Sequence, residues 1–421
     1  MSHYSTLSNN LKTNILRFSR SISTGLSIPQ FKFIFQMMYG LLCSQSCHLS
    51  NIARSLNETV LLKKTIERLS RNMSEFSNSK KLLNNYVKRV RSRLSKTTIL
   101  LVDDSDITKP CSIKMEGLQL IRDGSTGGYG VGYHTLAVTA LTPTHKSPIG
   151  IYTRVYSATE ATFVSATQET LKALEFIRKH FSRNCVRAFD RGYDANIFFE
   201  DMIDKKEKFV IRVNNKRKVK YKDNPINIYE LSKRFKGKFV LKFKKRNGVK
   251  VDCKISIVPI RLSFRPEADL NLVICHGFGK KPLLLITNMK SDDDQIAVTI
   301  TKVYLLRWRI EEFYRFKKQQ FGFEDFRVRS LNSIRNLDLI LTIAIGYIGL
   351  MSEQVDDKRL VMELIYISKR IFDTPKFMFY AIADGMYDLF ARSKKGVSYL
   401  LISKPNNYQF SLFRNPIFDI P

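Results

Sequence analysis

Between residues 98 and 213 the chain alternates short apolar runs of strand length with longer runs of helical periodicity. Their order is three strands, a helix, a strand, a helix and a strand, at 98–102, 133–141, 149–156, 165–181, 186–189, 195–203 and 209–213. A turn-rich segment separates the second strand from the third, which favours an antiparallel meander at the start. This order is that of an α/β fold with an RNase H-like core.

The segment from about 214 to 290 interrupts this order. Two alternating runs, 239–243 and 249–258, flank Asn247-Gly248, a dipeptide that favours a tight hairpin turn. Two more strands are expected at 270–275 and 283–287, so the segment is predicted to be a β-rich insert. A long helix is expected to follow it, beginning near the acidic run at 292–294.

The chain carries a large excess of positive charge. Its 421 residues include 70 Lys and Arg against 38 Asp and Glu, which gives a formal net charge of +32 at pH 7. Because the excess runs from end to end, a polyanionic partner such as nucleic acid is the natural interpretation. A protein from an organism whose proteins are generally basic, or a ribosome-associated protein, would show a similar excess of Lys and Arg. Both stay open as alternatives.

Residues 1 to about 95 are helical in periodicity and contain two helices joined by a short turn, at 49–58 and 61–71. This arrangement is typical of a helix-turn-helix, whose second helix enters a DNA groove. The basic side chains predicted to contact DNA from the second helix are Lys63, Lys64, Arg68 and Arg71. An ordinary helical hairpin with a solvated basic face is the alternative.

Neither a signal sequence nor a membrane span is expected. The longest apolar stretch, around 337–351, contains Asp338 and two glycines, and is predicted to be a buried helix. Six scattered cysteines indicate reduced thiols in a cytosol. Cys43, Cys47 and His48 lack a second ligand pair at zinc-site spacing, so no metal is expected there.

A single helix is expected to carry four polar residues with the spacing Y-x2-R-x3-E-x6-K: Tyr304, Arg307, Glu311 and Lys318. At about 100° per residue they fall within an arc of about 60° on one face. The opposite face carries the apolar residues Leu306, Ile310, Phe313 and Phe321. A carboxylate between two cations and a phenol suits a metal-bound phosphate better than a solvated surface.

Two aspartates complete a set of three carboxylates with Glu311. Asp104 follows the predicted strand 98–102, and Asp190 follows the strand 186–189. Carboxylates from three separate elements can hold two Mg²⁺ about 3.5–4 Å apart, which activate a hydroxyl and offset phosphate charge. Asp104, Asp190 and Glu311 are therefore predicted as catalytic metal ligands, with Mn²⁺ able to substitute. Asp103 is the main rival of Asp104, and each carboxylate alone has a structural alternative.

These residues resemble bacterial insertion-sequence DDE transposases with the Tyr-Arg-Glu-Lys signature, the insertion-sequence-four family. The resembling segments are 103–107, 190–194 and 304–313, and the resemblance covers about residues 95–330. The domains expected on this basis are a helical DNA-binding domain at 1–95, a catalytic domain at 96–330 with its β-rich insert at about 214–290, and a C-terminal helical region at 331–421 for synapsis or dimerisation.

The resemblance implies a DNA transposase that nicks one strand and uses the freed 3′-hydroxyl to attack the opposite strand. The resulting hairpin is opened, and the end is joined to target DNA. Asp104, Asp190 and Glu311 would hold two Mg²⁺, and Tyr304, Arg307 and Lys318 would grip phosphates. The implied partners are terminal inverted repeats, target DNA and a second copy in a synaptic homodimer. The implied location is the bacterial cytoplasm, at the nucleoid.

One departure from the family concerns the hairpin. Relatives that form hairpins hold a flipped base on a tryptophan of the insert, whereas the one tryptophan here, Trp308, lies in the signature helix. Phe264 or Phe278 would have to provide the stacking surface instead. A stand-alone nuclease on the same fold and a transposase-derived repressor are the alternative functions. The presence of all three carboxylates counts against the repressor.

Overall fold

The computed structural model describes residues 3–402, except 125, 245–249, 291–294, 354–357, 371–377 and 394. The helices are α1 (His3–Ile22), α2 (Ile28–Ser44), α3 (Leu49–Leu56), α4 (Leu62–Glu75), α5 (Ser79–Arg91), α6 (Ala166–Arg178), α7 (Asn196–Asp204), α8 (Ile228–Lys233), α9 (Ile296–Leu305), α10 (Trp308–Arg315), α11 (Leu331–Met351), α12 (Lys358–Ile367), α13 (Met378–Ala391) and α14 (Ser398–Ile402), with short helical turns η1 (Arg191–Tyr193), η2 (Phe316–Gln320) and η3 (Phe323–Asp325).

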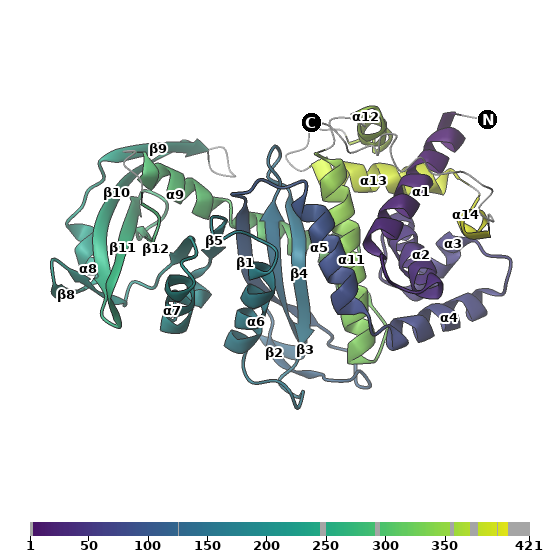
Figure 1. Ribbon diagram of the computed structural model, residues 1–421, viewed down its shortest axis with the longest axis horizontal. Coiled ribbons are helices and arrows are strands. Elements are labelled where there is room, and N and C mark those ends of the chain that lie inside the picture. Colours follow the sequence, from purple (N-terminus) through teal and green to yellow (C-terminus); the bar gives the residue numbers. More distant parts are fainter. Residues whose placement is uncertain are drawn as a thin grey trace.

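The strands are β1 (Ile99–Thr108), β2 (Gln119–Arg122), β3 (Tyr129–Leu141), β4 (Pro148–Tyr156), β5 (Val186–Phe189), β6 (Phe209–Arg212), β7 (Lys218–Tyr221), β8 (Asn224–Asn227), β9 (Phe239–Lys244), β10 (Lys250–Leu262), β11 (Arg265–His276) and β12 (Leu283–Thr287). The molecule is elongated, with a β-rich section, a central α/β section and a helical section side by side (Figure 1).

The central section is built on strands in the order β4-β3-β1-β5-β6. β1, β3 and β4 are antiparallel neighbours, while β5 and β6 run parallel to β1. Each strand overlaps a run that the sequence predicted. β1 differs in length, because it continues past Val102 to Thr108 and remains paired with β3 throughout. The aspartates at 103, 104 and 106 therefore lie within a strand and not at its end.

The insert extends the core sheet and does not form a separate one. β12 pairs antiparallel with β6, and β11 and β10 follow, so that the strands of the described residues join in one sheet of twelve. β9 and β10 are antiparallel neighbours, as predicted for a hairpin, but the predicted Asn247-Gly248 turn lies outside the described residues. The short strands β2, β7 and β8 were not predicted.

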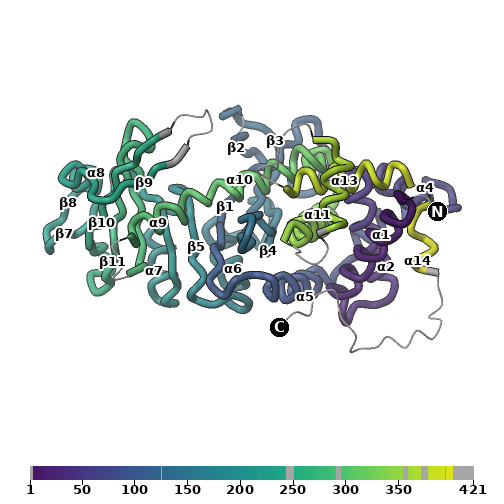
Figure 2. Tube along the Cα trace, turned by 90° about the horizontal axis from the view of Figure 1, so that it is seen from above, coloured from purple at the N-terminus to yellow at the C-terminus, as the bar shows by residue number. Residues whose placement is uncertain are grey.

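α11 lies between the sheet and the N-terminal helices (Figures 1 and 2). Among the described residues it is the one helix long and apolar enough to cross a membrane, but 89% of its most apolar window is buried, as predicted for a core helix. Asn336 donates to the carbonyls of Met73 and Phe76, which ties α11 to the end of α4. The N- and C-terminal helices therefore share one hydrophobic core. A synaptic role for 331–421 stays a prediction.

The prediction of a single helix through the signature residues is wrong. The structure divides this stretch into three segments, α9, α10 and η2. Between α9 and α10 the hydrogen bonds tighten, since the Arg307 amide donates to the Tyr304 carbonyl three residues back. After α10 comes η2, a π-helix. Its wider turn rotates Lys318 away from the stripe that regular turns predict. The expected acidic start at 292–294 lies outside the described residues. The apolar face is buried as predicted at Ile310, Phe313 and Phe321.

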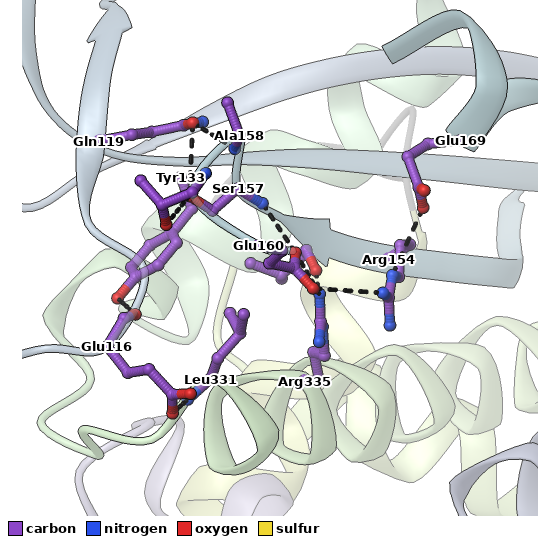
Figure 3. Close-up of polar contacts among 12 residues, drawn as sticks. Glu116, Gln119, Tyr133, Arg154, Ser157, Ala158, Glu160, Glu169, Leu331 and Arg335 are labelled. Carbon is purple, nitrogen blue, oxygen red and sulfur yellow. Dashed lines mark hydrogen bonds and ion pairs between the residues drawn. The ribbon is translucent and has the colours of Figure 1, made fainter. Parts of the chain in front are cut away.

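A polar hub ties α6 and α11 to the end of β4, and the loop after β1 joins it through α11 and β3 (Figure 3). Arg335 of α11 donates to both oxygens of Glu160 at 2.5 and 2.6 Å. Arg154 of β4 lies 3.6 Å from Glu160 and 3.5 Å from Glu169 of α6. Glu116 accepts from the first amide of α11 at 2.8 Å. The hub therefore fixes helices from both faces of the sheet to one strand.

Glu160→Gln should destabilise the protein and weaken its acid sensitivity. Desolvation opposes ionisation of Glu160, but hydrogen bonds from Arg335 and Ser157 outweigh it and lower the pKa. A carboxyl with a lowered pKa stabilises the fold above its unfolded pKa, about 4.3, and this contribution is lost as the pH falls. We expect a loss of about 1.5–3 kcal/mol at pH 7, shrinking as the pH falls below about 4.3.

Urea unfolding of wild type and Glu160→Gln at several pH values measures this difference. Glu175→Gln is the matched control, because Glu175 of α6 forms an exposed ion pair with Lys179, and such a pair is worth about 0.5 kcal/mol or less. A difference between Glu160→Gln and wild type that is independent of pH would contradict the role of the Glu160 charge.

Candidate active site

Successive residues of β1 point to opposite faces of the sheet, and this separates Asp103 from Asp104. Asp103 lies in one row of the sheet with Thr153, whose hydroxyl donates to α11. Asp104 lies in the next row with Arg154, which reaches Glu169 of α6. Asp103 therefore faces α10 and α11, whereas Asp104 faces α6.

Asp190 lies on the same face as Asp103. β5 runs parallel to β1, and their last paired residues directly precede Asp190 and Asp103. The Arg307 guanidinium joins the two: its Nη1 is 3.0 Å from Asp103 Oδ2, and its Nε is 3.9 Å from Asp190 Oδ1. Its Nη2 donates to Glu311 Oε1 at 2.5 Å. Carboxylates from β1, from the end of β5 and from α10 thus converge on one cation.

Asp103 is the most buried of the three carboxylates. Its side chain is 17% exposed, against 35% for Asp190 and 53% for Glu311. Burial raises the pKa of Asp103 to about 7; Arg307 opposes this rise, and the neighbouring carboxylates add to it. A buried carboxyl beside two other carboxylates is ionised only with help from nearby cations, so a further cation at this site would favour the charged form of Asp103.

Two tyrosines from the helical segment of the signature donate hydrogen bonds to the aspartates, one to a carboxylate and one to a main-chain carbonyl. The Tyr304 hydroxyl donates to Asp190 Oδ1 at 3.1 Å, and the Tyr314 hydroxyl donates to the main-chain carbonyl of Asp103 at 2.8 Å. Burial raises the pKa of both phenols, so both remain protonated donors at neutral pH. Tyr304 was singled out from the sequence as a phosphate contact. Tyr314 was missed, because it lies outside the signature spacing.

Arg212 and Tyr193 were also missed. Arg212 ends β6, the parallel neighbour of β5, and its Nη1 lies 3.7 Å from Asp190 Oδ1. Its place near the end of a predicted core strand was a partial signal, but the sequence alone does not show that this strand lies beside β5. The Tyr193 hydroxyl donates to Asp104 Oδ1 at 3.2 Å on the other face of the sheet. Asp104 thus has a structural partner of its own.

Lys318 is placed differently from the sequence-based expectation. Its Nζ lies 3.2 Å from Glu324 Oε1 and 3.6 Å from Asp106 Oδ2. Within the described part of the chain, these are its ion-pair partners, and Glu311 is not one of them. The π-helix accounts for the change. Lys318 therefore lies beside the C-terminal end of β1. A contact between Lys318 and a phosphate stays a prediction.

The three carboxylates fit a divalent cation by donor type. No group of three or more His, Cys, Asp or Glu side chains in the described ranges forms a ready-made metal site. However, Asp103, Asp190 and Glu311 supply the carboxylate oxygens that hard cations prefer, and they already surround the Arg307 guanidinium. The donor set fits a divalent ion once Arg307 moves aside.

The basic residues singled out on α4 differ in their environments. Lys63, Lys64 and Arg71 are exposed. Arg68 instead donates to both oxygens of Glu58 at 2.7 Å and to α2 at 2.6 Å. The hydrogen bond to Gln36 joins α4 to α2, and the ion pair joins α4 to the turn that precedes it. DNA contact by these four residues stays a prediction, and Arg68 differs from the other three in that Glu58 and Gln36 already engage its guanidinium.

A comparison with known families identifies the class of protein. Residues 94–346, more than half of the chain, match the family described as transposase DDE domain. The chain belongs to this family. The matched range includes all three carboxylates of this transposase and Arg307. Among solved structures, a piggyBac transposase synaptic complex with hairpin DNA aligns with 95% of this chain and 81% of its own, with 11% sequence identity and a TM-score of 0.46.

Proposed function

We propose that this transposase binds the ends of its mobile element and cleaves them in an active site formed by Asp103, Asp190 and Glu311. It then joins the 3′-hydroxyl ends to target DNA. The observation that carries the proposal is the convergence of these carboxylates, from three separate elements, on the Arg307 guanidinium. The net charge of +32 supports a polyanionic substrate.

Asp103 takes the place of Asp104 in this proposal. Its support is that Asp103 shares a face and a cation with Asp190 and Glu311, whereas Asp104 faces α6 and accepts from Tyr193. Mg²⁺, or Mn²⁺ in its place, would be held by Asp103, Asp190 and Glu311, and when bound it supplies hydroxyl activation and offsets phosphate charge.

The cations and phenol around the carboxylates are proposed to bind phosphate oxygens. Arg307 offers a planar fork of donors, Lys318 a point charge, and Tyr304 a neutral hydroxyl donor. Arg212 joins this set, because it lies beside Asp190 with its side chain 40% exposed. The spacing of the signature residues supports membership of the insertion-sequence-four group. The order β4-β3-β1-β5-β6, antiparallel and then parallel, supports an RNase H-like core.

A strand-transfer assay tests the proposed function. A labelled element end, supplied in one reaction intact and in another pre-cleaved to a 3′-hydroxyl, is incubated with the protein, Mg²⁺ and a target plasmid, with Glu311→Gln as the inactive control. We expect joined products with wild type alone. Cutting without joining would favour a stand-alone nuclease, and binding without either reaction would favour a repressor. Light scattering of the complex should give two copies per pair of ends if the assembly is a synaptic dimer.

A hollow beside Asp190 is a candidate site for a flipped base. Its volume is about 240 Å³, and its lining includes Phe278, Arg191, Arg212 and Lys280. Phe278 is 38% exposed, whereas Phe264 packs against the core. An aromatic ring surrounded by cations suits a base and its phosphate. We therefore propose Phe278, and not Phe264, as the stacking surface of a hairpin pathway.

Phe278→Ala should reduce hairpin formation about tenfold and leave first-strand nicking within about twofold of wild type. Loss of one base–aromatic stack is worth about 1–3 kcal/mol, and a nick does not require the flipped base. Phe278→Trp, which keeps the stacking surface, is the matched control and should retain the hairpin. Nicked and hairpin products are separated on denaturing gels. An equal loss of both products with Phe278→Ala would contradict a stacking role.

Replacing both Lys63 and Lys64 with alanine should weaken end binding and flatten its salt dependence. Each phosphate contact contributes a slope of about −0.9 to log affinity against log salt, so the slope should become shallower by about 1.8. Arg68→Ala is the comparison: it should lower thermal stability, because the Glu58 carboxylate loses its ion pair with Arg68. Fluorescence anisotropy at several salt concentrations measures the slope. An unchanged slope for the double variant would remove α4 from the DNA interface.

A further inference from the structure

A buried ion pair lies on the same face of the sheet as Asp103, between Lys317 of the π-helix η2 and Asp338 of α11. Both side chains are 1% exposed. Lys317 Nζ donates to Asp338 Oδ1 and, at 3.2 Å, to the Thr342 hydroxyl. Asp338 Oδ2 accepts from the Thr153 hydroxyl of β4. The pair therefore links η2, α11 and the central sheet.

Stability alone does not account for this pair. Desolvating two charges can outweigh their attraction, and apolar side chains of similar volume often give an equally stable core. Lys317 is also enclosed by rings, because its Nζ lies 5.3 Å from the Phe313 ring centre and 4.8 Å from that of Phe323. A charge enclosed by rings and paired with one carboxylate can occupy a single position, so its main effect is on the placement of the helices that carry the pair.

The contacts of this pair, together with a glycine of β4, bear on the distance between the sheet and the helices α10 and α11. Thr153, which anchors Asp338, belongs to the same row of the sheet as Asp103. Three residues earlier on β4, Gly150 permits a close approach: a Cβ there would meet Thr342 at 2.6 Å and Phe313 at 2.8 Å. α10 and α11 thus pack in direct contact with the sheet at Gly150 and cannot move closer to it.

The same turn of chain sends neighbouring lysines in different directions. Lys317 points into the core toward Asp338, whereas Lys318 points to Asp106 and Glu324 at the end of β1. The π-turn that allows this arrangement directly follows α10, which carries Glu311. A shift of Lys317 would therefore move Lys318 and rotate α10 together.

We propose that Lys317 and Asp338 are positioning residues: their buried pair sets the height and rotation of α10 over β1, and thereby places Glu311 and Lys318 in the active site. The catalytic part of this inference rests on the proposed function. The structural part, the placement of α10, does not depend on it.

Trp308 allows the placement to be measured directly. It is the only tryptophan of the chain, it begins α10, and it is 40% exposed. Its fluorescence therefore reports on α10 alone. In the double variant Lys317→Met with Asp338→Leu, we expect a folded protein with end binding within about twofold of wild type. We also expect the emission maximum of Trp308 and its quenching by iodide to differ from those of wild type. Cleavage should be at least 30-fold slower than in wild type.

Two further measurements keep the test independent of folding and of activity. Mn²⁺ quenching of Trp308 in the full-length protein without DNA should require at least tenfold more Mn²⁺ in the double variant. Thr153→Val removes a single hydrogen bond to Asp338 and should give a smaller change of the same kind. If the double variant fails to fold, Thr153→Val decides the outcome: a changed Trp308 signal supports positioning, and an unchanged one overturns it.

Lys12→Met is the matched control. Lys12 is a buried lysine away from the site, whose Nζ donates to Ser393 at 2.9 Å and to the Lys395 carbonyl. Its replacement should lower the unfolding temperature without changing the Trp308 signal. Unchanged Trp308 fluorescence and cleavage in the folded double variant would overturn the proposal. If wild type shows no cleavage, the proposed function fails, while the Trp308 and Mn²⁺ results still decide the positioning role.

Discussion

Asp103→Asn should slow single-turnover cleavage of an element end by about 1,000-fold or more, whereas Asp104→Asn should stay within about tenfold of wild type. A 1,000-fold loss corresponds to about 4 kcal/mol of transition-state stabilisation. The reason for the difference is the alternation of β1: Asp103 shares the Arg307 guanidinium with Asp190 and Glu311, while Asp104 faces α6.

The two variants are matched controls for one another, because both replace a β1 carboxylate with its isosteric amide. End binding should be unchanged in both, measured by gel shift, since neither removes a phosphate contact. Asp104→Asn should lose about 1 kcal/mol of stability through its weakened hydrogen bond with Tyr193. An inactive Asp104→Asn beside an active Asp103→Asn would restore the sequence-based choice of Asp104.

The order of elements could be predicted from the sequence, but the length of β1 could not. Apolar runs mark Leu100, Leu101 and Val102 as a buried strand, and the strand should end at the aspartates, because Asp is disfavoured in strands. In the structure β3 stays paired with β1 as far as Thr108. That pairing comes from a neighbour more than twenty residues away along the chain, which local propensity does not include.

The signature spacing correctly brings Arg307 and Glu311 together, because they lie one helical turn apart. It misplaces Lys318, because the assumption of regular turns fails at a π-helix whose Lys317 is held by Asp338, a long-range contact. Arg212 was missed for a similar reason: it approaches Asp190 only because β5 and β6 are parallel neighbours. Periodicity assigns residues to faces of one element, and the packing of elements decides which faces meet.

Arg307→Ala should slow cleavage by about 30-fold or more, equivalent to about 2 kcal/mol, if the guanidinium binds the reacting phosphate. It should also lower the unfolding temperature without added metal, because Asp103, Asp190 and Glu311 would then repel one another with no shared cation. Mg²⁺ should restore more stability to Arg307→Ala than to wild type, since the same carboxylates become available to it. Differential scanning fluorimetry with and without Mg²⁺ measures this.

The competing explanation is a helix salt bridge between Arg307 and Glu311, four residues apart. An exposed pair of that kind is worth about 0.3–0.5 kcal/mol, so its loss would barely change either rate or stability. Arg315→Ala is the matched control, because Arg315 pairs with Glu312 on the same helix, away from the three carboxylates. It should cleave within a few-fold of wild type and show no added response to Mg²⁺. If Arg307→Ala behaves like Arg315→Ala in both measurements, the guanidinium is a helix salt bridge and has no part in binding phosphate.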